Sequence, residues 1–131
     1  MLPFTVETVR LSLHLLAVAV WIGGQLVMAS LVPVLRSVAP GAPAAAAKRF
    51  GQVAWAAFAV AVVTGVWNML ALPADQPDGY DATLGVKLLF VMLSGLAAAV
   101  HSRTSSAAVR GATGGLGLLA SLAALVFGVM L

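Results

Sequence analysis

The chain has 131 residues, of which 62% are hydrophobic and only 8% are charged, and its mean hydropathy is +1.07. A soluble domain of this size could not cover so apolar a surface with polar groups, so the composition predicts an integral membrane protein. Cysteine is absent, which excludes disulfides and thiolate metal ligands. The net charge of +3 comes from bases in the expected loops, which indicates membrane lipid headgroups as partners and no nucleic acid.

Four apolar stretches are long enough to cross a bilayer, whose core of about 30 Å needs roughly 20 apolar residues per helix. They cover residues 9–34, 50–72, 84–103 and 112–131. The first contains Trp21, Gln25 and Met28 too far along the chain for a cleaved signal peptide, so we expect it to be retained as a helix. The prediction is an all-α fold, a single four-helix transmembrane domain over residues 1–131.

The expected connections differ in charge. The stretches "RSVAPGAPAAAAKR" and "SRTSSAAVRGATGG" carry bases, whereas "LPADQPDGYDAT" carries three aspartates and no base. Lys and Arg in short loops mark the cytoplasmic side. We therefore expect a multi-pass protein of a bacterial-type cytoplasmic membrane with both termini outside (N-out/C-out), an orientation that Arg10, near the outer start of the first helix, slightly opposes.

Each predicted helix carries one face that differs from the rest of its surface. At 100° per residue, the polar and aromatic side chains of the first helix fall within about 40° of His14. The four faces are Arg10, His14, Trp21, Gln25 and Met28; Thr64 and Asn68; Lys87, Ser94 and His101; and Gly114, Ser121 and Gly128. Because a charge facing lipid costs at least about 2.5 kcal/mol at mid-membrane, these faces favour an integral membrane four-helix bundle with its polar stripes turned inward.

His14 is the main candidate site residue, since an ionisable group inside a membrane is a functional hypothesis by default. We expect it about one turn below the outer surface, with Lys87, Asn68 and Met69 at a similar height. His101 belongs to the cytoplasmic end, about 18 Å deeper at 1.5 Å per residue, so the two histidines cannot share one metal ion within a monomer. The alternatives are a hydrogen-bonded packing role for His14, headgroup contact for Lys87 and an interfacial role for His101.

Methionine offers a second type of ligand. Met69, Met92 and Met130 belong to the expected outer half, where thioethers together with an imidazole would suit Cu(I). Packing is the alternative role for scattered methionines.

The stretches "LHLLAVAVWIGG", "KRF", "TGVWN" and "LGVKLLFVMLSGLAAAVHSR" resemble, in order and spacing, the membrane domain of the copper resistance D family. The resemblance covers residues 9–131 and implies a role in copper passage or tolerance. Larger members of that family carry additional helices, so the chain is similar to the shared domain alone.

A histidine ahead of a Trp-Gly pattern and a lysine ahead of a histidine are also similar to the small four-helix protoporphyrinogen oxidases that bind haem. That resemblance implies His14 and Lys87 as the functional pair. Here "GGQLVMASLVPVLR" stands where that family has an aromatic, tyrosine-rich segment. This departure weakens the implied oxidase activity, whereas the resemblance still implies a haem-binding membrane redox protein.

Three functions follow as hypotheses. The first is a copper-handling membrane protein whose metal ligands come from His14, Met69, Met92, Met130 and His101. The second is a haem b protein with His14 as an axial ligand and Lys87 completing the coordination or pairing with a propionate, lined by Trp21 and Asn68; an axial ligand requires only one imidazole. The third is a non-catalytic subunit of a larger membrane complex or a homo-oligomer. Whether the chain is an enzyme is left open.

Overall fold

The computed structural model describes residues 3–131, and within that part the chain forms four helices. They are α1 (Val6–Val38), α2 (Ala42–Leu70), α3 (Tyr80–Arg103) and α4 (Ala107–Val129). Each is long and apolar enough to cross a membrane. The predicted all-α class with four membrane-spanning helices is therefore confirmed.

The helices extend beyond the apolar stretches that predicted them. α2 begins at Ala42 because the alanines of residues 42–47 favour helix and Pro43 is tolerated in the first turn. α4 begins at Ala107 because the Ser106 side chain accepts a hydrogen bond from the backbone N–H of Val109. The bases expected in the two basic loops accordingly lie within helices: Arg36, Lys48, Arg49, Arg103 and Arg110.

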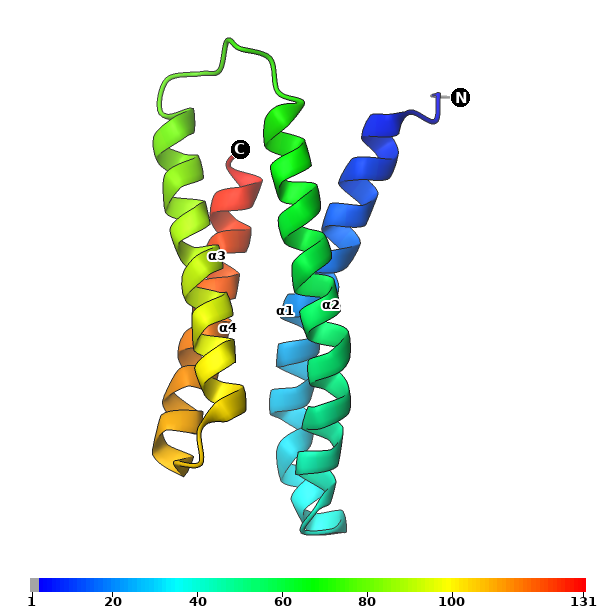
Figure 1. Cartoon of the computed structure of the whole chain (residues 1–131), viewed down its shortest axis with the longest axis vertical. Helices are drawn as coiled ribbons and strands as arrows, with labels where there is room; N and C mark the ends of the chain where they lie inside the picture. Colours follow the sequence, from blue (N-terminus) through cyan, green and yellow to red (C-terminus); the bar gives the residue numbers. More distant parts are fainter. Residues whose placement is uncertain (1–2) are drawn as a thin grey trace. The chain divides into compact units, whose positions relative to one another are not determined.

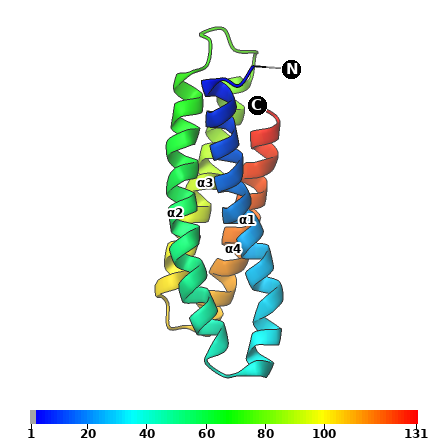
Figure 2. The ribbon, with the colours of Figure 1, turned by 90° about the vertical axis from the view of Figure 1, so that its right-hand side faces the viewer.

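The chain divides into two compact units, the first ending at Leu72 and the second beginning at Pro73. Each unit is a helical hairpin, since α1 packs on α2 and α3 packs on α4. In both hairpins the helices run antiparallel around a short turn (Figures 1 and 2). Large aliphatic side chains remain exposed on all four helices, as expected for surfaces that face lipid hydrocarbon.

Aromatic side chains hold the first hairpin together. Trp21 is buried, and its ring centroid lies 4.5 Å from that of Phe58 and 5.6 Å from that of Trp55. One turn further along α1, the ring of Phe50 occupies the place where a Cβ on Gly24 would lie. Gly24 therefore lets α2 approach α1 closely, whereas a Cβ on the adjacent Gly23 would meet nothing within 4 Å.

Hydroxyl groups and glycines hold the second hairpin together. The buried Ser94 and Ser121 are joined by a hydrogen bond of 2.6 Å between their Oγ atoms. Ser121 also donates to the Gly117 carbonyl of its own helix at 2.8 Å. Small residues at such interfaces let helix backbones approach closely in a membrane, so the serine pair can bond directly across the hairpin.

Candidate functional site

The side chain of His14 is anchored across the first hairpin. Its Nδ1 lies 2.9 Å from Thr64 Oγ1, so the bond joins α1 to α2. Thr64 is 4% exposed, which places this contact inside the hairpin. The expected polar face of α2 is thus turned toward the polar face of α1.

The hydrogen bonds of Thr64 determine the tautomer of His14. Thr64 Oγ1 donates its one hydrogen to the backbone carbonyls of the preceding turn, at 2.6 Å from Val60 O and 3.3 Å from Ala61 O. The hydroxyl oxygen therefore accepts from His14, whose Nδ1 must carry the hydrogen. In the neutral imidazole this places the ligand lone pair on Nε2. A ligating histidine typically donates its other ring N–H to the protein in this way.

Gly65 leaves room for the imidazole ring. A Cβ at this position would lie 3.3 Å from His14 Cε1 and 3.8 Å from Nδ1. The Thr64-Gly65 pair of α2 therefore fixes both the protonation pattern of the ring and the space in which it lies.

Arg10 and Asn68 form the next layer of polar groups in the first hairpin. Arg10 is one turn before His14 on α1, and Asn68 is one turn after Thr64 on the antiparallel α2, so they occupy the same faces as the His14–Thr64 pair. Arg10 Nε and Asn68 Oδ1 are both buried, and neither has a hydrogen-bond partner within residues 3–131. A buried cationic donor and a buried acceptor are thus left unsatisfied one turn from the imidazole, toward the helix ends.

Two predicted site residues of the second hairpin, Lys87 and His101, lie along its helix interface. Lys87 Cε and Nζ lie 3.3 Å from the position of a Cβ on Gly128. His101 Nδ1 lies 3.0 Å from the corresponding position on Gly114 and 2.8 Å from the carbonyl oxygen of Arg110, to which it donates. The polar stripe of α3 therefore faces the small-residue stripe of α4.

The remaining predicted site residues are more scattered. Trp21 belongs to the aromatic cluster of the first hairpin, two turns further along α1 than His14. Met69 follows Asn68 directly and is 37% exposed, while Met92 and Met130 of the second hairpin are 72% and 65% exposed. Within the described chain, no three His, Cys, Asp or Glu side chains gather as a metal-binding group.

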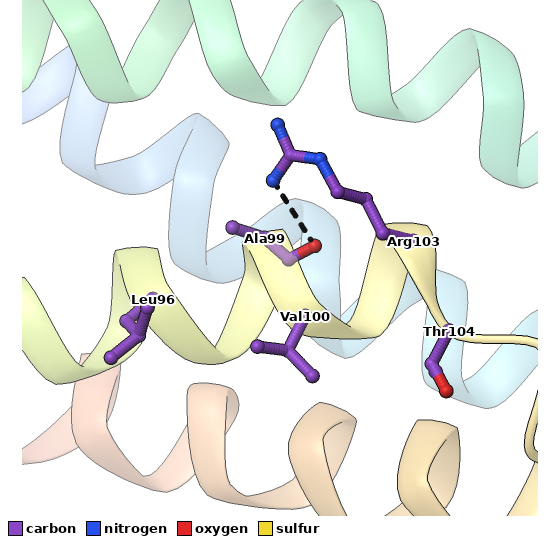
Figure 3. Close-up of a pocket in the computed structure, with 5 residues that line it drawn as sticks. All are labelled: Leu96, Ala99, Val100, Arg103 and Thr104. Carbon is purple, nitrogen blue, oxygen red and sulfur yellow. Dashed lines mark hydrogen bonds between the residues drawn. The ribbon is translucent and has the colours of Figure 1, made fainter.

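A shallow hollow lies at the end of α3 and is lined by Leu96, Ala99, Val100, Arg103 and Thr104 (Figure 3). Arg103 folds back along the helix, and its Nη1 donates to the Ala99 carbonyl at 3.5 Å. A cation at this position stabilises the C-terminal end of a helix. The hollow holds no second ionisable group among its lining residues, so it offers less chemistry than the surroundings of His14.

Sequence reasoning placed Thr64 and Asn68 on one face but did not assign Thr64, Gly65 or Arg10 to the site. The four-residue spacing of Thr64 and Asn68 was the available signal. The missing information was the register between α1 and α2, which brings Thr64 to His14.

Comparison of the chain with protein-family models, with curated proteins and with solved structures finds no match.

Proposed function

We propose that the chain is a copper-handling protein of a bacterial-type cytoplasmic membrane, in which His14 receives Cu(I) through Nε2. The observation that carries this proposal is the Thr64 hydrogen bond, which keeps the proton on Nδ1 and the lone pair on Nε2. Imidazole and thioether are both suitable copper ligands, and Met69 lies near the same end of the same hairpin. The resemblance to the copper resistance D family supports copper as the metal.

Haem b is the second candidate, and the buried Nε of the half-buried Arg10 favours it. A porphyrin supplies four iron ligands, so a single imidazole is sufficient as an axial ligand. A guanidinium one turn from that imidazole would pair with a propionate. In this alternative, His14 would hold the iron and Arg10 with Asn68 would orient the group, which would supply one-electron chemistry when bound.

Metal analysis of the purified full-length protein tests the first proposal. We expect wild type to bind Cu(I) and His14→Ala to lose most of it. His101→Ala is the matched control, because it removes the other histidine, in the second hairpin, and should leave copper content unchanged. Copper content that does not respond to His14→Ala would show that His14 is not the copper site.

The absorption spectrum of the same sample tests haem. Expression with ample haem should give a Soret band that shifts on reduction and disappears in His14→Ala if haem is the ligand, and no Soret band if copper is. Both proposals would be contradicted if the copper content does not depend on His14 and no Soret band is seen. Co-purification with a partner protein would then favour a role as a membrane subunit.

A further inference from the structure

We infer that Arg10 and Asn68 form a binding site for a lipid headgroup, specifically a phosphodiester headgroup that carries its own hydrogen-bond donor. Phosphatidylethanolamine and phosphatidylglycerol have this chemistry. The site is independent of copper binding at His14, and it is an alternative to haem binding, in which the same two residues would hold a propionate.

Two unsatisfied atoms define the chemistry of the site. Arg10 Nε is a buried donor and Asn68 Oδ1 is a buried acceptor, each without a partner among residues 3–131. Leaving such groups unpaired is costly, and more so where the group is charged. A ligand that satisfies both must accept from a guanidinium and donate to an amide oxygen. A phosphate oxygen can accept from the guanidinium, and an ammonium or a glycerol hydroxyl can donate to the amide. A choline headgroup has the phosphate but no N–H or O–H donor.

The position of the layer along the helices matches the depth of headgroups. α1 has 33 residues and α2 has 29, which correspond to lengths of about 50 and 43 Å at 1.5 Å per residue. Both exceed the hydrocarbon core of about 30 Å, so the helix ends reach the polar zone of the bilayer. Arg10 lies one turn from the start of α1 at Val6, and Asn68 lies two residues from the end of α2 at Leu70. The layer therefore lies at the end of the hairpin where headgroups are found, with His14 one turn deeper.

Lipid retention measured by native mass spectrometry tests the inference. The full chain is reconstituted into vesicles of equal phosphatidylethanolamine and phosphatidylcholine and then extracted, and the lipids that stay bound are counted. We expect wild type to retain phosphatidylethanolamine several-fold over phosphatidylcholine. Arg10→Gln and Asn68→Leu should each abolish that preference. Arg103→Gln, which removes an exposed arginine of the second hairpin, is the matched control and should keep it.

Four further measurements make the outcome decisive. Circular dichroism and tryptophan fluorescence should show that Arg10→Gln keeps the helices and the Trp21 environment, and Arg10→Lys, which retains the charge, should recover part of the preference if folding is intact. Soluble glycerophosphoethanolamine, which has the same headgroup without acyl chains, should compete only at far higher concentration than the lipid. If the soluble compound competes at the same concentration as the lipid, the site binds a free phosphodiester and the inferred lipid ligand is wrong.

Two other results would also overturn the inference. Equal retention of both lipids by wild type and Arg10→Gln would mean that water satisfies the two atoms. A loss of haem content in Arg10→Gln with unchanged lipid retention would assign the layer to haem propionates instead.

Discussion

At the scale of single residues, the environment of His14 is set by groups on the neighbouring helix. The Thr64 hydroxyl donates a hydrogen bond to the Val60 carbonyl in the preceding turn of α2, which is a common arrangement for a threonine inside a helix. Because its hydrogen is used there, the oxygen can only accept, and His14 must donate. A residue that touches no ligand therefore determines which imidazole nitrogen a metal would meet.

Thr64→Val tests this positioning role. Valine keeps the shape of the side chain but removes the acceptor, so the imidazole is no longer held in one tautomer. Loss of such a supporting hydrogen bond typically costs about 10–100-fold in metal affinity, and we expect a decrease of that order in Cu(I) affinity measured by competition with a chelator. Thr64→Ser should keep the wild-type Cu(I) affinity, because the serine hydroxyl can make the same hydrogen bonds.

A spectroscopic signature separates positioning from packing. The ¹⁵N chemical shifts of His14 should report hydrogen on Nδ1 in wild type and in Thr64→Ser, and a mixture of tautomers in Thr64→Val. Unchanged affinity and unchanged shifts in Thr64→Val would contradict the role assigned to this threonine.

At the scale of elements, each hairpin is held by a register that matches large groups with small ones. In the second hairpin, three residues of α3 spaced by seven meet three residues of α4 spaced by seven. The matched pairs are Lys87 with Gly128, Ser94 with Ser121, and His101 with Gly114. Because the helices are antiparallel, the order of one stripe is the reverse of the other. The first hairpin uses aromatic side chains in place of this regular pattern, and Gly24 is its point of closest fit.

Gly24→Ala tests the close approach of α1 and α2. The added Cβ would occupy the position of the Phe50 ring, and such overpacking typically costs about 1–3 kcal/mol. We expect a lower thermal unfolding midpoint in detergent. Gly23→Ala is the matched control: its Cβ meets nothing within 4 Å, and replacing a glycine inside a helix by alanine stabilises by about 0.5–1 kcal/mol. Equal destabilisation by both variants would contradict the assigned contact.

At the scale of the whole molecule, composition and apolar length were sufficient to predict four spanning helices, because a bilayer imposes both. The helix ends were predicted less well. Hydropathy marks where the membrane core is, whereas the alanines of residues 42–47 and the Ser106 cap determine where α2 and α4 begin. For the site, periodicity identified His14 and the face shared by Thr64 and Asn68. The pairing of His14 with Thr64, however, depends on the register between α1 and α2. Periodicity within one helix does not fix that register, so the pairing became visible only in the folded hairpin.

The orientation of the chain in the membrane is a prediction that its composition makes easy to test. Because the sequence contains no cysteine, a single introduced cysteine gives an unambiguous label. The bases near the α1–α2 and α3–α4 turns predict that these turns are cytoplasmic, and the aspartates between α2 and α3 predict an outer connection. In intact cells, a membrane-impermeant maleimide should therefore label Asp78→Cys, while Ala39→Cys and Ser105→Cys should react only after permeabilisation. These two cytoplasmic positions come from different hairpins, so each tests the orientation of its own pair of helices. Labelling of Ala39→Cys in intact cells would show that the first hairpin has the opposite orientation. Arg10 would then lie at the cytoplasmic surface, where the positive-inside bias favours a base.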